Sequence, residues 1–149
     1  MTTIIVYTSQ ATAEGGGDIE AIEFDEGEEM DIQIVSYGTD CMYNAILSAA
    51  KDKDLLDKAT TVEVIKEGIN EASKRAMAKA AISKLRLPAC ICIEDGNGNA
   101  VVDYNKNIVD ESDTIFILER LGGFHYDWLK RRGAAAGGSA GGASLALRF

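Results

Sequence analysis

The chain has 149 residues, 46% of them hydrophobic, and a formal net charge of −9. A chain of this length can bury a core without disulfides or a structural metal, and a charged fraction of 26% is typical of a folded globular protein rather than a disordered one. No apolar run approaches the ~20 residues of a membrane span, and the first residues lack the basic region of a signal peptide. We therefore expect a cytoplasmic protein, or a virion component, without a membrane partner.

The negative charge lies in the first half of the chain. Residues 1–69 contain fifteen acidic and four basic residues. A nucleic-acid partner requires a concentrated basic face, so this distribution argues against one. The three cysteines, Cys41, Cys90 and Cys92, are an odd number without paired C-x-x-C spacing, so we expect neither a disulfide framework nor a metal site.

The N-terminal elements are expected to be β-structure. Residues 3–9 form a β-type run, a Gly-Gly-Gly break follows at 15–17, and eight acidic residues lie between positions 18 and 31. The partial alternation of apolar and acidic residues at 19–24 suits an edge strand or hairpin arm, and the acidic run does not match the ligand spacing of a calcium loop. We treat residues 1–30 as an N-terminal β extension.

From position 31 the pattern predicts alternating strands and helices. A strand over 32–35 precedes a helix that Thr39 or Asp40 can cap, with apolar residues at helical spacing through Ala50. A short helix over 54–59 then leads into a β-branched strand over 60–65, and Asn70 can cap a long helix that ends at Leu85. Residues 89–104 read as a β-hairpin around an Asp-Gly-Asn-Gly turn.

The last element is predicted to be a helix over 110–121, ended by Gly122 and Gly123. The order β–α–β–α–β–β–α then gives a mixed sheet with helices on both faces, an α/β fold. His125 has no triad partner that its sequence neighbours would supply, and we expect it in an aromatic patch that seals this helix. Trp128 of the same patch is a candidate interface anchor.

These elements, together with the segment Y-G-T-D-C-M-Y-N at 37–44 and Leu87-Pro88, resemble the thioredoxin and glutaredoxin family over residues 31–122. The resemblance implies a thioredoxin-like domain, which we bound at 31–132. It implies that Cys41 stands at the N-terminus of the first helix and that Pro88 is a cis proline packed beside the thiol. C-M-Y-N is similar to the C-P-Y-C of glutaredoxins, with Asn44 in place of the second cysteine.

Cys41 is the candidate catalytic residue if the protein is redox-active. The free N–H groups and the positive dipole end at the start of a helix stabilise a thiolate, which is the nucleophile in disulfide exchange. Without a second cysteine only a monothiol cycle remains, with glutathione as its cofactor, and Asp40 places a negative charge beside the thiol. Cys90 and Cys92 alternate along an apolar strand and are expected to pack in the core.

Residues 133–149 change sharply in composition. Eleven of the seventeen are glycine or alanine, and the segment ends in Leu145, Leu147 and Phe149. Such a segment is a flexible arm with an apolar docking end, although an expression linker is the alternative explanation. We expect a non-catalytic thioredoxin-fold assembly module without a cofactor that docks on protein subunits through this arm, for example a capsid cement or tail-adaptor protein of a virion. The alternative is a monothiol oxidoreductase that uses Cys41.

Overall fold

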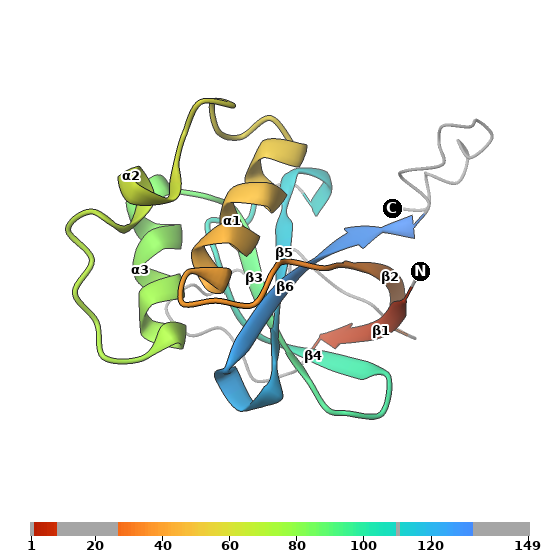
Figure 1. Ribbon diagram of the computed structural model, residues 1–149. Coiled ribbons are helices and arrows are strands. Elements are labelled where there is room, and N and C mark those ends of the chain that lie inside the picture. The colour runs from red at the N-terminus through yellow and green to blue at the C-terminus, as the bar shows by residue number, and fades with distance from the viewer. Residues whose placement is uncertain (1, 9–26, 110, 133–149) are drawn as a thin grey trace.

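The structure, a computed structural model, describes residues 2–8, 27–109 and 111–132. Six strands close into a mixed barrel in the order β1-β2-β6-β5-β3-β4 (Figure 1). The strands are β1 (Thr3–Thr8), β2 (Glu28–Gln33), β3 (Ala89–Glu94), β4 (Asn99–Lys106), β5 (Ile115–Arg120) and β6 (His125–Arg131). Pairs β1/β4 and β3/β5 are parallel, and the other four pairs are antiparallel.

Three helices lie between β2 and β3 in the chain and gather on one side of the barrel (Figure 1). They are α1 (Cys41–Asp52), α2 (Val62–Lys66) and α3 (Lys74–Leu85), and two short 3-10 turns, η2 (Glu111–Asp113) and η3 (Leu121–Gly123), precede and follow β5. Helix α1 packs on β5 and β6. The amphipathic pattern predicted for α1 is confirmed, because its buried residues include Ala45, Ile46 and Ala49.

The protein has two cores that share the sheet between them. The barrel interior holds Ile4, Val6, Met30, Ile32, Cys90, Cys92, Ala100, Val102, Ile108, Phe116, Leu118 and Leu129. The second core lies between the helices and the outer face of the barrel, and it contains Ile46, Ile65, Ile82, Ile91 and Ile117 among others. Because successive side chains of a strand point to opposite faces, β3 sends Cys90 and Cys92 inward and Ile91 toward the helices. The predicted core role of these two cysteines is confirmed.

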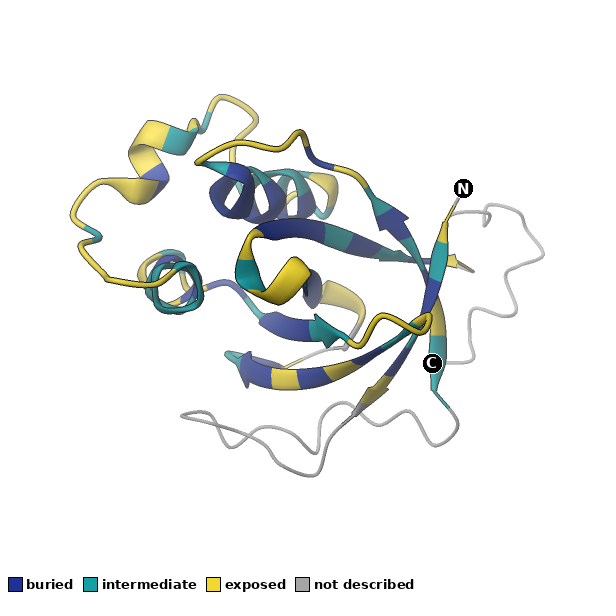
Figure 2. Cartoon of the chain, turned by 60° about the horizontal axis from the view of Figure 1, so that its bottom comes forward, coloured by how far each residue is buried: buried dark blue, intermediate teal, exposed yellow. Residues whose placement is uncertain are grey.

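The predicted helix over 110–121 is wrong, because Ile115–Arg120 is strand β5. Residues 115–119 are buried along the strand, whereas burial alternates along β4 (Figure 2). A strand covered on one face by the barrel interior and on the other by helices loses the period-2 pattern and reads as an apolar run. The strand predicted over 60–65 is also wrong. Val62–Lys66 is the one-turn helix α2, and the Thr61 side chain accepts a hydrogen bond from the Val64 N–H at 3.4 Å.

The remaining expectations have mixed outcomes. The hairpin at 89–104 is confirmed as β3 and β4. The long helix starts at Lys74 and is capped by Ser73 rather than by Asn70, while residues 54–59 form turns instead of a helix. The edge strand expected at 19–24 and the arm at 133–149 lie outside the described residues.

The thioredoxin-like fold class is contradicted by the closed barrel. A thioredoxin-like fold is an open sheet with helices on both faces, whereas here one face of every strand lines the barrel interior. The Leu87–Pro88 peptide is trans, because no cis peptide bond occurs in the described parts of the chain. Strand β1, in the expected N-terminal extension, pairs with β4, so it is an integral barrel strand. No helix in the described ranges is long and apolar enough to cross a membrane.

Candidate active site

Cys41 is the first residue of α1, where the loop after β2 turns into the helix. Its side chain is buried, with 1% of the residue exposed. The Sγ atom lies 3.9 Å from Lys74 Nζ, at the start of α3, and 4.0 Å from the carbonyl oxygen of Phe124. A helix N-terminus and a neighbouring ammonium group are the surroundings in which proteins place nucleophilic thiols. Cys41 is therefore held where chemistry on a thiol is favoured.

His125 begins β6 and is also 1% exposed. Its Nε2 lies 2.8 Å from Asp127 Oδ1, and its ring stacks on Tyr37 with the centroids 3.9 Å apart and the planes at 14°. The other ring nitrogen, Nδ1, is buried and has no hydrogen-bond partner among the residues that the structure describes. A buried imidazole nitrogen without a partner is costly, so it needs an explanation in the chemistry of the site.

Asp127 can bind the imidazole of His125 because residues two apart on a strand point to the same face. Its carboxylate also accepts hydrogen bonds from the Val35 N–H at 2.7 Å and from Arg120 Nη1 at 2.8 Å. Arg120 is fixed in turn by Glu94, through two hydrogen bonds of 2.8 and 3.3 Å. The carboxylate is 1% exposed and its orientation is determined by three donors.

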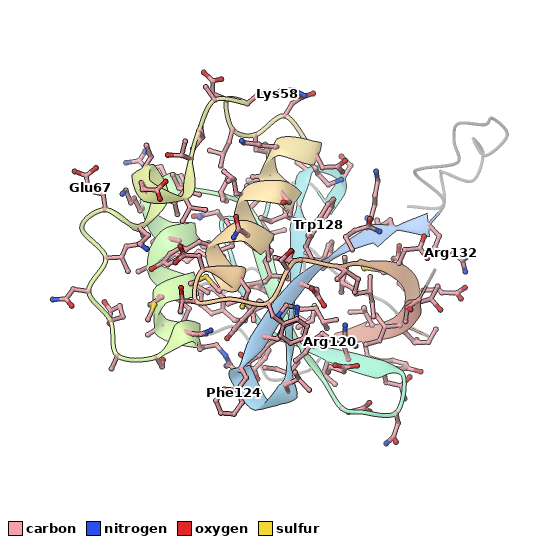
Figure 3. The ribbon with its side chains drawn as sticks, in the orientation of Figure 1. Lys58, Glu67, Arg120, Phe124, Trp128 and Arg132 are labelled. Atoms are coloured by element: carbon pink, nitrogen blue, oxygen red, sulfur yellow. The ribbon has the colours of Figure 1, made fainter. Side chains whose placement is uncertain are left out.

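The Cys41 thiol approaches β6 at the backbone of Phe124. The carbonyl group that lies 4.0 Å from Cys41 Sγ belongs to the peptide bond that enters His125. Phe124 itself is 80% exposed and points outward at the turn between β5 and β6 (Figure 3). Sγ is not hydrogen-bonded to Nδ1 here, but catalytic hydrogen bonds are often long or misaligned without substrate. The thiol thus lies against the backbone that leads to His125, and a carboxylate orients the imidazole of that residue.

A cavity of about 220 Å³ lies at the start of α3, where Lys74, Gly122 and Gly123 line it. Its far wall is an ion-pair network in which Arg75 Nε donates to Glu119 Oε1 at 2.8 Å and the Tyr126 hydroxyl donates to the same oxygen at 2.7 Å. Burial alone would raise the pKa of Glu119, but the hydrogen bonds from Arg75 and Tyr126 outweigh it and lower that pKa below its usual range. The wall therefore presents a satisfied carboxylate.

The structure groups the sequence-predicted residues differently from the expectation. The peptide bond before Pro88 is trans. The Pro88 carbonyl accepts a hydrogen bond from the Ile115 N–H at 2.9 Å and so connects the start of β3 to the start of β5. Trp128 is partly buried on β6 and lines a second cavity. Leu145, Leu147 and Phe149 lie outside the described residues.

Sequence reasoning missed His125 and Asp127. The aromatic patch expected around His125 is wrong, because the helix that it would seal is strand β5, and the buried histidine instead stacks on Tyr37 and binds a carboxylate. The available signal was the pattern His-Tyr-Asp, which on a strand puts both polar side chains on one face, combined with a cysteine at the start of a predicted helix. The pattern was hidden because the preceding segment was assigned to a helix.

Within the described ranges, no group of three or more His, Cys, Asp or Glu side chains is placed to hold a metal ion. No protein-family model matches the chain, and neither the curated proteins nor the solved structures contain a significant match to it.

Proposed function

We propose that the protein is a cysteine-dependent acyl hydrolase, most specifically a peptidase, in which Cys41 is the nucleophile, His125 the general base and acid, and Asp127 the residue that orients His125. The observation that carries the proposal is the buried imidazole of His125. Asp127 holds it at one nitrogen, its second nitrogen has no partner among the described residues, and the backbone carbonyl of the preceding residue lies 4.0 Å from a helix-N-terminal thiol. Nucleophile, base and orienting group in this relation are the signature of covalent acyl transfer on unrelated folds.

The chemistry follows from these positions. His125 Nδ1 takes the thiol proton, and Cys41 Sγ attacks the carbonyl carbon of an amide bond. The C–N bond then breaks, and the departing nitrogen takes the proton from Nδ1 and leaves as an amine, with the acyl group held as a thioester. Water next gives a proton to Nδ1 and attacks the thioester. The C–S bond breaks, the acid is released, and the thiol regains its proton.

Asp127 and Lys74 contribute to different parts of this sequence. Asp127 keeps Nε2 of His125 hydrogen-bonded. This fixes the tautomer in which Nδ1 can accept a proton. The Lys74 ammonium group, 3.9 Å from Sγ, supplies positive charge where negative charge develops during the attack.

A polypeptide substrate is favoured by the side chains around the site. Tyr37, which covers the His125 ring, is 72% exposed, and the neighbouring Phe124 is 80% exposed. Exposed aromatic side chains that flank a buried nucleophile are suited to bind a polypeptide rather than to interact with water. Their presence is the reason to place peptides ahead of small esters as the substrate.

The test uses p-nitrophenyl acetate, a small ester that any nucleophilic thiol of this kind can cleave. We expect a burst of p-nitrophenol and an acetyl group on the peptide that contains Cys41, located by mass spectrometry. His125→Gln should slow acetylation by about 10²–10⁴-fold, the usual contribution of a general base. The matched control is Asp103→Asn, which removes an exposed carboxylate outside the site. Equal acetylation of the wild type and His125→Gln would contradict the proposal.

Two earlier hypotheses stay predictions. The assembly role depends on the arm at 133–149, so deletion of that segment followed by an assembly measurement tests it. The monothiol role of Cys41 is tested by reduction of a glutathione mixed disulfide with a Cys41→Ser control. In that assay His125→Gln separates the two chemistries, because acyl hydrolysis needs the imidazole as a base, whereas exchange requires only a thiolate.

A further inference from the structure

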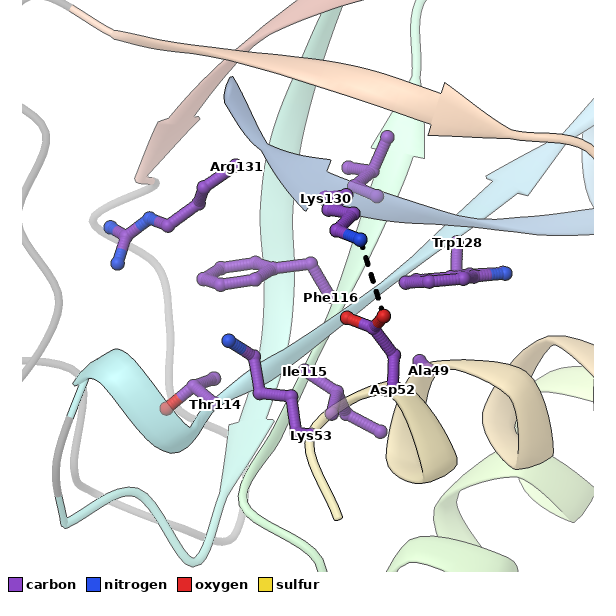
Figure 4. A pocket seen from close by; sticks show the side chains of 10 residues that line it. Ala49, Asp52, Lys53, Thr114, Ile115, Phe116, Trp128, Lys130 and Arg131 are labelled. Carbon is purple, nitrogen blue, oxygen red and sulfur yellow. Dashed lines mark hydrogen bonds and ion pairs between the residues drawn. The ribbon is translucent and has the colours of Figure 1, made fainter. Parts of the chain in front are cut away.

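A second cavity, of about 350 Å³, lies between the C-terminal end of α1, the beginning of β5 and the end of β6 (Figure 4). It lies at the opposite end of α1 from Cys41, about 18 Å away for a twelve-residue helix. Its volume falls in the range of small-molecule sites, which are roughly 300–1,000 Å³. The proposed peptidase chemistry uses none of the residues that line it.

Cationic side chains dominate the polar part of this cavity. Lys53, Lys130 and Arg131 line it, against a single carboxylate, Asp52. This is unusual in a chain with a net charge of −9. Figure 4 shows Asp52 reaching up from α1 to Lys130, with Lys53 on the same side of the cavity as Asp52. The local excess of positive charge predicts an anionic ligand.

The three cations differ in how far their charge is already neutralised. Lys130 Nζ pairs with Asp52 Oδ1 at 3.2 Å, and Arg131 donates two hydrogen bonds to Glu28, of 2.7 and 2.9 Å. Lys53 donates to the backbone carbonyl of Ser112 at 2.9 Å and forms no ion pair with a described residue. Burial and the neighbouring Arg131 lower the pKa of Lys53, although Asp52 and Asp113 act in the opposite direction, so the nearby carboxylates do not fully compensate its ammonium group. Lys53 is thus the cation that a bound anion would neutralise.

The apolar part of the cavity is aromatic. Phe116, which is 2% exposed, and the partly buried Trp128 both contribute to its wall. Arg131 Cζ lies 5.7 Å from the centre of the Phe116 ring, so this ring is already polarised by a cation on one side. Flat apolar walls beside a concentrated positive charge suit a ligand that has a planar ring and an anionic substituent.

We propose that this cavity is a binding site for a small aromatic anion, an aryl carboxylate or aryl phosphate, whose anionic group lies at Lys53 and whose ring packs on Trp128 and Phe116. This proposal is independent of the peptidase function, because its evidence and its test concern binding alone.

Trp128 is the sole tryptophan and lines the cavity, so its fluorescence reports binding directly. The full-length protein is titrated with phenyl phosphate, benzoate, inorganic phosphate and neutral benzamide. We expect phenyl phosphate or benzoate to bind at least tenfold more tightly than benzamide, and the better of the two identifies the preferred anionic group. Binding should weaken at high salt. Inorganic phosphate should bind more weakly than phenyl phosphate, because it makes no contact with the rings.

The variant that tests the assignment is Lys53→Gln, with Lys58→Gln as its matched control. Lys58 is an exposed lysine in the loop after α1 (Figure 3) and does not line the cavity. Lys53→Gln should weaken phenyl phosphate binding about tenfold while leaving benzamide binding unchanged, and Lys58→Gln should change neither. Thermal melting of each variant shows that it is folded. Equal binding of benzamide and phenyl phosphate, equal losses in the two variants, or no binding by any probe would overturn the proposal.

Discussion

Replacing Asp127 with asparagine tests whether this carboxylate holds the site together. Asparagine keeps the size of the side chain, and its Oδ1 can still accept from the Val35 N–H and from His125. Its amide group replaces the oxygen that accepts from Arg120 Nη1 at 2.8 Å, so a donor then faces a donor. A hydrogen bond to a charged group contributes about 1.5–3 kcal/mol. Because Arg120 keeps Glu94 as a partner, we expect a loss near the middle of that range, about 2 kcal/mol.

The measurement is urea unfolding followed by Trp128 fluorescence, with thermal melting as a second readout. A loss of this size should lower Tm by about 4–8 °C in a chain of this length and leave the urea m-value unchanged. Asp103→Asn is the control, because Asp103 also pairs with an arginine, at 2.6 Å from Arg75, but its side chain is 49% exposed. It should lose less than about 1 kcal/mol. Equal losses in the two variants would refute the reasoning that burial makes the Asp127 contacts valuable.

Three further predictions concern stability. Glu119 has a pKa below its usual range in the folded protein. Its contribution to the free energy of unfolding is therefore present above the unfolded pKa of about 4.3 and is lost as the pH falls through the lower folded value. Glu119→Gln should flatten the decline in stability between about pH 5 and pH 3, measured by urea titration at each pH. Gly27 and Gly68 share a φ of +82°, but a Cβ on Gly27 would lie 2.6 Å from the Ile5 side chain while one on Gly68 meets nothing within 4 Å. Gly68→Ala should cost about 1–2 kcal/mol and Gly27→Ala at least about 1 kcal/mol more, and equal costs would show that the side chains of Ile5 and Tyr7, which both lie under 3.0 Å from that Cβ, move away. Cys92 is fully buried in the barrel interior, so Cys92→Ser should lose about 1–3 kcal/mol, and no loss would mean that the hydroxyl has found a partner there.

Local signals determined the parts of the fold that depend on neighbouring residues. The helix at Cys41–Asp52 has apolar residues at helical spacing, and the hairpin of β3 and β4 has a glycine-rich turn between two apolar runs. Both features are encoded within about fifteen residues, so they can be read without tertiary information. The position of Cys41 at a helix N-terminus belongs to the same class.

Other segments are ambiguous because tertiary contacts determine their structure. Strand β5 is buried on both faces, so its sequence cannot distinguish a strand from a buried helix. Three of the five residues 62–66 are β-branched, and the segment still forms a helical turn, because burial of Ile65 against the other helices outweighs their preference.

The sequence alone determined that the chain can bury a core, that a helix starts at Cys41, and that Cys90 and Cys92 pack in the core. Only the tertiary structure decided that the sheet closes into a barrel, because closure depends on β1 pairing with β4 across more than ninety residues of chain. The same closure places β6 beside α1, so that the Cys41 thiol lies 4.0 Å from the carbonyl oxygen of Phe124, 83 positions later in the chain. Long-range pairing of this kind leaves no periodic trace in the sequence, which is why the helix at Cys41 could be predicted and the surroundings of its thiol could not.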